Sequence, residues 1–343
     1  MDYKEAGVDI DAGNEVVRRI RSLAIGTFTP GVLSDLGSFG GMFALSGQDV
    51  HDPVLVASAD GVGTKLRVAF MTGVHDSIGA DLVNHCVNDI LVQGARPLFF
   101  LDYLATGRLD PDVAVQVVEG LAGACRANGC ALLGGETAEM PGFYADGEYD
   151  LAGFVVGIVG REQIVDGRSI VPGDLLIGVP SSGLHTNGYS LARRIAFDVA
   201  GLAHGDYVPE LGTSIGNALL VPHRTYLPLV QPLLRAGLVK GMAHITGGGI
   251  TENLPRILPA GACAEVVRSA WSVPAIFRWL QHTGRVPDDD MLRTFNMGIG
   301  LAVVCAAGNA DAVLESLAEA GEPGAARIGA IRPGTPEVRY VSG

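Results

Sequence analysis

The sequence predicts a two-domain protein in which β-strands and α-helices alternate, an α/β or α+β fold. The chain has 343 residues, which is enough for two domains of ordinary size. Hydrophobic residues make up 48% of it and charged residues 18%, a composition typical of globular proteins. Short apolar runs alternate with helical patterns in both halves, and many of these runs end in Gly-rich turns.

The bulk properties exclude several kinds of partner. A formal net charge of -13 argues against a nucleic-acid surface, which needs clustered Lys and Arg. No apolar stretch is long enough to span a bilayer, and the N-terminus does not resemble a signal peptide. The five cysteines show no CxxC spacing, which indicates free thiols in a reducing compartment. We therefore expect a cytoplasmic protein that binds neither nucleic acid nor membrane.

In the first half, strands and helices are predicted in alternation. Periodicity predicts helices over residues 14–23, 78–92 and 112–127. Apolar runs predict strands over residues 54–58, 97–104, 131–133 and 151–159.

A change in amino-acid composition predicts the domain boundary. Residues 161–172 are polar and carry two turn signals, Gly167 and Pro172. We place the boundary near residue 168. A strand over residues 175–179 and a helix beginning at Tyr189 then open the second half.

The first candidate site follows the strand at residues 54–58. Its sequence is Asp60-Gly61-Val62-Gly63-Thr64-Lys65. The glycines leave backbone N–H groups accessible and Lys65 adds a positive charge, so the segment could hold a phosphate group. It does not have the spacing of a Walker A loop. A tight turn with a surface lysine is the alternative.

The second candidate is a polar stripe on the helix predicted over residues 78–92. At about 100° per residue, one side of this helix carries Asp81, Asn84, His85 and Asn88, with Asp89 at its edge. Short Asp and Asn side chains hold oxygen ligands close to the backbone, which suits Mg²⁺. A helix face that makes polar contacts at an interface is the alternative.

The third candidate is the Gly-rich segment Gly134-Gly135-Glu136-Thr137-Ala138-Glu139-Met140-Pro141-Gly142. We expect Glu136 just past the end of the strand at residues 131–133, placed to bind a metal or act as a general base. The alternative is a solvated loop carboxylate, which the two preceding glycines disfavour because they shield Glu136 little.

Two Gly-rich turns in the second half are candidate anion sites. One is Ser181-Ser182-Gly183-Leu184-His185-Thr186-Asn187-Gly188-Tyr189-Ser190, and the other is His244-Ile245-Thr246-Gly247-Gly248-Gly249-Ile250-Thr251-Glu252-Asn253. Backbone N–H groups at a helix start attract anions. The alternatives are a structural role for His185, an N-cap role for Asn187, and a strained hinge at the three glycines.

Taken together, these segments resemble the phosphoribosylformylglycinamidine cyclo-ligase family, also called aminoimidazole ribonucleotide synthetases. Further matching segments are Tyr3-Lys4-Glu5-Ala6-Gly7-Val8-Asp9-Ile10, Cys86-Val87-Asn88-Asp89, Phe99-Phe100-Leu101-Asp102-Tyr103 and Phe295-Asn296-Met297-Gly298-Ile299-Gly300. The resemblance covers nearly the whole chain.

The resemblance implies a two-domain α+β fold. The N-terminal sheets of two subunits would pair across a homodimer into a shared barrel, and the C-terminal sheet would be covered by helices. Residues 1–168 would bind ATP and form the dimer, and residues 169–343 would bind the substrate. ATP and Mg²⁺ would be required, the ion being held by acidic residues.

The implied reaction is ring closure of formylglycinamidine ribonucleotide, driven by ATP. The catalytic residues would be Asp60, Glu136, His185 and Asn187. ATP and its phosphates would contact Lys4, Gly61, Gly63, Thr64, Lys65 and Asp89. The substrate would contact Ser182, Gly183, Thr186, Gly188, Gly247, Gly248 and Gly249. The ligands of Mg²⁺ would be Asp60, Asp76, Asp89 and Glu136.

Two other functions fit less well. Selenophosphate synthetases need a reactive Cys or selenocysteine near the N-terminus, and the first cysteine here is Cys86. A catalytically silent nucleotide-binding homologue would be expected to lose the carboxylates, yet Asp60, Asp89 and Glu136 are present.

Overall fold

The protein divides into two compact units that interleave in the chain. The structure, a computed structural model, describes residues 9–34 and 40–342. Unit 1 consists of Met1–Ile90 and Ala95–Glu162, and unit 2 of Leu91–Gly94 and Gln163–Gly343. The long second segment of unit 2 therefore begins slightly before the predicted boundary at residue 168. The separate functions assigned to residues 1–168 and 169–343 stay predictions.

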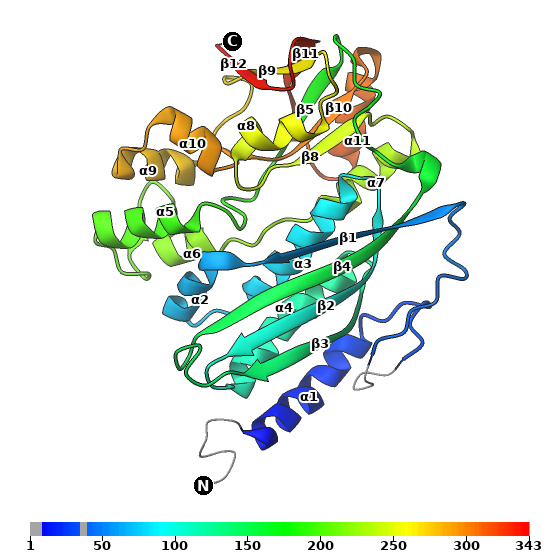
Figure 1. Ribbon diagram of the computed structural model, residues 1–343. Coiled ribbons are helices and arrows are strands. Elements are labelled where there is room, and N and C mark those ends of the chain that lie inside the picture. Colours follow the sequence, from blue (N-terminus) through cyan, green and yellow to red (C-terminus); the bar gives the residue numbers. More distant parts are fainter. Residues whose placement is uncertain (1–8, 35–39, 343) are drawn as a thin grey trace. The chain divides into compact units, whose positions relative to one another are not determined.

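A four-stranded sheet forms the centre of unit 1, in the order β1-β4-β2-β3 (Figure 1). Strands β1 (Pro53–Gly61) and β2 (Arg96–Thr106) both pair antiparallel with β4 (Tyr149–Gly160). Strand β3 (Ala131–Glu139) pairs parallel with β2, and helix α4 (Pro111–Ala127) connects the two. A crossover of this length is what a parallel pair requires.

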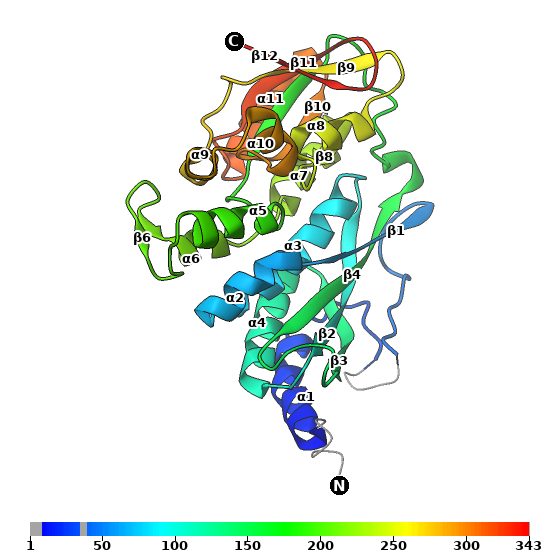
Figure 2. The ribbon, with the colours of Figure 1, turned by 60° about the vertical axis from the view of Figure 1, so that its left-hand side comes forward.

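Helices cover one face of this sheet. Figures 1 and 2 show α3 (Asp76–Leu91) and α4 on the same side, and α1 (Ile10–Ile25) packs against α4 and β3. Local sequence fixes two of the helix starts, because Asp9 and Asp110 each accept hydrogen bonds from backbone N–H groups of the first turn. The short α2 (Leu66–Thr72) ends at Gly73, which has a positive φ.

Helices α3 and α4 approach closely at two glycines. A Cβ atom on Gly120 would lie 1.8 Å from the carbonyl oxygen of Asp76, and one on Gly79 would lie 2.2 Å from that of Val117. No side chain larger than hydrogen fits at either position unless the helices move apart. These glycines therefore set the separation between α4 and α3, the helix that carries the polar stripe.

The opposite face of the sheet carries exposed apolar side chains. Alternate residues of each strand point to opposite faces. Leu151 and Val155 are buried on the helix side, whereas Leu55, Phe154 and Tyr103 are 53%, 46% and 36% exposed on the other. We call this second surface the open face.

A six-stranded sheet forms the centre of unit 2, in the order β12-β9-β11-β5-β10-β8. Its strands are β5 (Leu175–Pro180), β8 (Gly241–His244), β9 (Ala262–Val267), β10 (Ile299–Cys305), β11 (Ala326–Pro333) and β12 (Val338–Val341). Every residue of β10 is buried, so this strand is covered on both faces. Ala302 and Val304 of β10 belong to one core cluster with Ile250 and Leu254.

Shorter elements surround this sheet. The helices are α5 (Tyr189–Arg193), α6 (Ile215–Leu220), α7 (Leu227–Arg235), α8 (Gly249–Asn253), α9 (Ala275–Gly284), α10 (Asp288–Thr294) and α11 (Ala310–Glu319). A π-helical turn, Arg194–Val199, continues α5, and β6 (Tyr207–Val208) pairs with β7 (Thr213–Ser214). No helix in the described part of the chain is long and apolar enough to cross a membrane.

The predicted elements are confirmed, with one correction of consequence. Each predicted helix and strand is present, with ends that differ by a few residues. The strand predicted over residues 131–133 is longer, because β3 continues to Glu139 in register with β2. Glu136 therefore lies within a strand and not in a loop beyond it. The two glycines hid the strand, since Gly is unfavourable in strand interiors.

Candidate functional site

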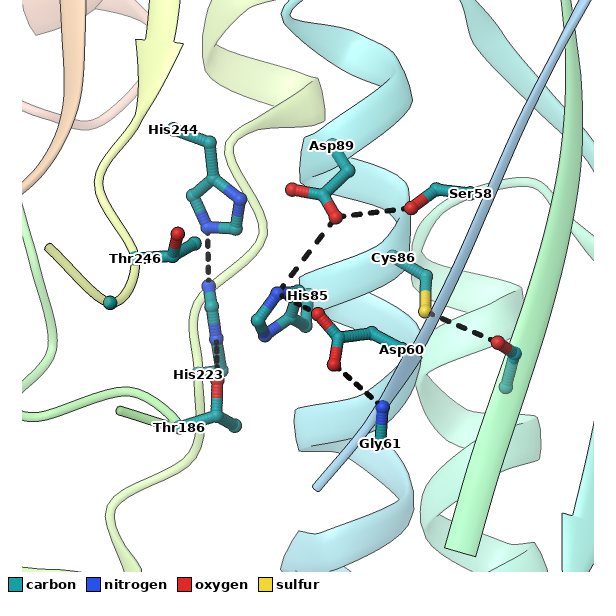
Figure 3. A network of polar contacts seen from close by, with 12 residues as sticks. Ser58, Asp60, Gly61, His85, Cys86, Asp89, Thr186, His223, His244 and Thr246 are labelled. Atoms are coloured by element: carbon teal, nitrogen blue, oxygen red, sulfur yellow. Dashed lines mark hydrogen bonds and ion pairs between the residues drawn. The ribbon is translucent and has the colours of Figure 1, made fainter. Parts of the chain in front are cut away.

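Two of the predicted metal ligands meet at a buried histidine in unit 1. Asp60 lies near the end of β1, and His85 and Asp89 lie one turn apart on α3 (Figure 3). His85 Nε2 is 2.7 Å from Asp60 Oδ2 and 3.8 Å from Asp89 Oδ2. Ser58, two residues before Asp60 and therefore on the same face of β1, donates its hydroxyl to Asp89 at 3.1 Å. We call these four residues the Asp60–Asp89 cluster.

The charges of this cluster support one another. Burial lowers the pKa of His85, but the hydrogen bond to Asp60 and the negative charges of Asp89 and Asp60 outweigh it, so this pKa lies above its ordinary value. Burial raises the pKa of Asp60, but the hydrogen bond and charge of His85 and the Gly61 N–H outweigh it, so this pKa lies below its ordinary value. Asp60 is therefore ionised at neutral pH.

The cluster fits a hard divalent cation. Mg²⁺ is usually bound in proteins by one or two carboxylates, together with waters and substrate phosphates. Asp60 and Asp89 supply two carboxylates that converge on one point, which His85 Nε2 now contacts. A cation at this point would take over the electrostatic role of a protonated His85.

The other two predicted ligands lie elsewhere. Asp76 is the first residue of α3, so it is about 20 Å along the helix axis from Asp89. The register Gly61–Ala152–Tyr103–Glu136 places Glu136 across the sheet, on the open face, whereas Asp60 points to the helices. Within one chain the four predicted ligands therefore do not lie together, and metal binding by Asp76 and Glu136 stays a prediction. Helix length and strand alternation separate them.

In the segment after Asp60, the lysine lies in a different environment from the one expected. Gly61 N–H donates to Asp60 Oδ1 at 2.7 Å, and both Gly63 and Thr64 are exposed. Lys65 is fully buried, and its Nζ lies 2.8 Å from Asp81. Its ammonium group thus neutralises a buried carboxylate of the polar stripe. Contact of Gly61, Gly63, Thr64 or Lys65 with phosphate stays a prediction, and Lys4 lies outside the described residues.

In unit 2, His185 lies in a strained turn between β5 and α5. Its φ of 62° is in the left-handed region, which non-glycine residues adopt rarely, although His does so more often than most. Its ring is fully buried and stacks on that of His223, with centroids 3.9 Å apart. A Cβ atom on Gly300 would lie 2.5 Å from His185 Cε1, so Gly300 makes room for this ring.

The turn around His185 is held by its own backbone and by the segment before α7. Ser182 N–H donates to His185 Nε2 at 3.2 Å, and the Ser182 hydroxyl donates to the carbonyl oxygen of Pro222 at 2.6 Å. Thr186 Oγ1 is 3.3 Å from His223 Nδ1. Gly183 accepts a hydrogen bond from Asn296 at 2.8 Å.

Asn187 carries the feature that most favours a ligand here. Its Nδ2 is buried and has no hydrogen-bond partner among the described residues. A buried amide donor without an acceptor costs about 1–3 kcal/mol, so such groups are commonly found where a ligand binds. The Asn187 side chain lies beside Gly247, since a Cβ atom there would be 3.3 Å from Asn187 Oδ1.

Two of the three glycines at the start of α8, Gly248 and Gly249, are required by backbone conformation and packing. Gly248 and Gly249 have φ values of 97° and 60°. A Cβ atom on Gly249 would lie 2.0 Å from the carbonyl oxygen of Leu292. The Glu252 side chain packs against Gly248, which places negative charge beside the turn. Binding of the substrate by Ser182, Gly183, Thr186, Gly188 and these three glycines stays a prediction.

Several contacts of these buried histidines could not be predicted from the sequence. His85 was seen on the polar stripe, but nothing in the sequence indicated its ion pair with Asp60, which requires the packing of β1 on α3. His223 and His244 are both buried, and their Nε2 atoms are 3.0 Å apart. His223 lies in the segment Pro222-His223-Arg224, which matches no motif and is 21 residues from His244. Only the folded structure brings the two histidines together.

Comparison with solved structures defines the class of protein. A thiamine-monophosphate kinase from Stenotrophomonas maltophilia K279a superimposes with a TM-score of 0.71 at 19% identity, covering 95% of each chain. The hydrogenase maturation protein HypE of E. coli gives 0.66 at 21% identity, over 94% of this chain and 92% of its own. Residues 47–159 and 171–341 match the N-terminal and C-terminal domains of AIR synthase related proteins. The predicted two-domain α+β fold is confirmed.

Sequence relatives narrow the class to one family. Proteins named phosphoribosylformylglycinamidine cyclo-ligase from Trichlorobacter lovleyi and Sorangium cellulosum are each 56% identical. The first match covers 93% of this chain and 92% of the relative, and the second covers 94% and 93%. The chain belongs to the phosphoribosylformylglycinamidine cyclo-ligase family, and the resemblance stated from its motifs is confirmed.

Proposed function

We propose that this protein is a ligase of purine biosynthesis that closes the imidazole ring of 5-aminoimidazole ribonucleotide. It uses ATP and formylglycinamidine ribonucleotide and releases ADP and phosphate. High identity to cyclo-ligases over nearly the whole chain is the observation that carries this proposal. The reaction takes place in the cytoplasm, where the five free cysteines would stay reduced.

The chemistry divides into activation and closure. The formyl amide oxygen of the substrate is a poor leaving group. Transfer of a phosphoryl group from ATP converts it into a good leaving group. The amidine nitrogen then attacks the activated carbon and phosphate leaves. Both reacting groups belong to one molecule, so the protein contributes chiefly by folding the substrate and by stabilising charge.

Asp60 and Asp89 would act in the activation step. Their carboxylates would hold Mg²⁺, which when bound supplies positive charge to the phosphates of ATP. Before the ion binds, His85 lies between the two carboxylates, and the ion would take its place there. Asp76 and Glu136 lie apart from the Asp60–Asp89 cluster within one chain, so we assign this cation to Asp60 and Asp89.

His185 and Asn187 would act on the substrate. The buried Asn187 Nδ2 can donate a hydrogen bond to an oxygen of the substrate. Ser182 N–H donates to His185 Nε2, so a neutral ring would carry its proton on Nδ1 and could donate a hydrogen bond from there. The strained backbone of His185 is consistent with a position kept for function.

Two subunits would associate through the open face of the unit 1 sheet. Leu55, Phe154 and Tyr103 supply exposed apolar area to this surface. Burying such a face against a second copy removes it from water, which is the dominant favourable contribution to association. The homodimer with a shared barrel, implied by family resemblance, uses this surface.

One assay tests the function directly. Purified protein is incubated with ATP, Mg²⁺ and formylglycinamidine ribonucleotide, and ADP and aminoimidazole ribonucleotide are quantified. Equal amounts of the two products are expected. ADP formation without the imidazole product would instead indicate a phosphotransferase of the same fold.

A further inference from the structure

Three buried histidines of unit 2 converge from separate segments of the chain. His185 precedes α5, His223 precedes α7, and His244 ends β8. A ring nitrogen from each lies within 4.8 Å of one from each of the others. The exposed fractions are 0%, 0% and 6%. We call this group the histidine trio.

We propose that the histidine trio is a binding site for a divalent transition-metal ion of the zinc class, distinct from the Mg²⁺ site. This inference goes beyond the ligase activity and does not depend on it. Imidazole nitrogen is a ligand that favours zinc, copper and nickel, whereas Mg²⁺ prefers oxygen ligands. Three histidines with a fourth position left for water form an established class of zinc site.

The separation of two of the donor atoms fits such an ion. His223 Nε2 and His244 Nε2 face each other at 3.0 Å, as Figure 3 shows. Zinc–nitrogen bonds of about 2.0–2.1 Å at tetrahedral angles would set two ligand nitrogens about 3.3 Å apart. To admit the ion, these two nitrogens would have to move a few tenths of an ångström apart, and the rings would have to turn so that both lone pairs point at the ion.

The hydrogen bonds of the trio are compatible with a lone pair on Nε2 in two of the three rings. Thr186 Oγ1 can accept the proton of His223 Nδ1, which leaves a lone pair on Nε2. His185 Nε2 accepts the Ser182 N–H at 3.2 Å, so it also presents a lone pair, and the ion would replace this long hydrogen bond. His244 needs only to move its proton from Nε2 to Nδ1.

Surrounding groups support the arrangement. Thr186 orients His223 in the way that partners of a metal-bound histidine commonly do. Arg224, the neighbour of His223, donates to Glu322 and to the carbonyl oxygen of Pro180, so its charge is balanced. Cys263 and Cys305, the cysteines of unit 2, are buried in strands β9 and β10.

The first test measures zinc binding by the full-length protein after treatment with a chelator. Calorimetry in the presence of a competing indicator should give one tightly bound Zn²⁺ per chain, and a large excess of Mg²⁺ should not displace it. His223→Gln should weaken this binding at least about 100-fold, and Thr186→Val about 10–100-fold. The matched control is His282→Gln, an exposed histidine of α9, which should bind as the unchanged protein does.

The second test identifies the ligands without any substitution, so it holds even if His223→Gln does not fold. X-ray absorption at the zinc edge should show three imidazole nitrogens at about 2.0–2.1 Å. Three results would overturn the proposal: no zinc bound at micromolar concentration, binding unchanged by His223→Gln, or sulfur at about 2.3 Å. In the first case the trio is a hydrogen-bonded structural cluster.

Discussion

The aspartates of this protein differ in their burial and in their ion-pair partners. Asp60 and Asp89 share a histidine, Asp81 neutralises the buried Lys65, and Asp76 stands at the exposed start of α3. These differences arise from position on the same few elements. They allow substitutions of one chemical kind to be compared directly.

Asp89→Asn should reduce ATP-dependent turnover while the fold survives. The amide keeps the shape of the side chain but removes a hard anionic ligand of Mg²⁺. We expect kcat/KM to fall about 100-fold, equivalent to about 2.7 kcal/mol of transition-state stabilisation. Steady-state kinetics at several Mg²⁺ concentrations measures the loss.

The control for this experiment is Asp76→Asn. This residue begins the same helix but lies about 20 Å from Asp89, so its activity should stay within about twofold of the unchanged enzyme. If the two variants lose equal activity, the separation of Asp76 from the cation site is wrong.

Asp102 should make stability depend on pH. It lies on β2, and burial raises its pKa to about 7. Because the unfolded chain titrates near pH 4, the folded state alone keeps the proton between about pH 4 and 7. The stability contributed by Asp102 is therefore full below pH 4 and is lost as the pH rises towards 7.

Asp102→Asn should remove this dependence, since the amide resembles the neutral acid. Between pH 5 and 7.5, the free energy of unfolding of the unchanged protein should fall by about 1–3 kcal/mol more than that of the variant. Urea unfolding at the two pH values measures it. If the free energy of unfolding changed equally with pH in both proteins, Asp102 would already be ionised in the folded state.

At the scale of elements, the crossing of α3 and α4 depends on residues without side chains. Gly120→Ala would place a Cβ atom 1.8 Å from the Asp76 carbonyl oxygen. The helices must then move apart, and we expect a loss of about 1–3 kcal/mol in the free energy of unfolding.

Gly123→Ala on the same helix is the matched control. Its Cβ atom would meet only the tip of the Arg126 side chain, at 3.9 Å. Because Ala favours the helix more than Gly does, this variant should be neutral or up to about 1 kcal/mol more stable. Thermal unfolding of both variants decides the matter. If both variants were as stable as the unchanged protein, or more stable, the helices would accommodate the added methyl group, and helix propensity, not the crossing, would govern both positions.

Elements were easier to predict from the sequence than the contacts between them. Helix α3 and the short strands could be predicted because the spacing of their apolar residues is a local pattern. The end of β3 was misjudged because Gly134-Gly135 imitates a turn, although pairing with β2 carries the strand through it. Tertiary pairing overrode local propensity there.

The candidate site was predictable only where chemistry followed from one segment. Asp89 could be found from its helix stripe, and Asp60 from its place at a strand end. The pairing of His85 with Asp60 and the histidine trio join segments distant in the chain, and no spacing rule reports them. The position of Glu136 relative to Asp60 could not be predicted, because the pairing of β3 with β2 decides which face of the sheet Glu136 occupies.

At the scale of the whole molecule, the open face should determine the oligomeric state. We expect a dimer in solution at micromolar concentration. Phe154→Asp, which puts a charge on the exposed apolar face of β4, should shift the protein towards the monomer. Analytical ultracentrifugation over a concentration series measures this.

The control is Phe143→Asp. Phe143 is 72% exposed but follows β3 in a loop, outside the sheet. This variant should remain a dimer. A monomer for the unchanged protein, or equal dissociation of both variants, would argue against pairing through the open face.

The interleaving of the two units affects how the chain is made. Leu91–Gly94 belongs to unit 2 but is translated between two elements of unit 1, and Gln93 receives its hydrogen bond from Val165. At about 5–20 residues per second, the ribosome delivers Val165 roughly 4–15 seconds after Gln93. During that interval the end of α3 emerges without its later partner. A nascent chain stalled before residue 165 should therefore expose this stretch to proteases or chaperones, and release from the stall should protect it.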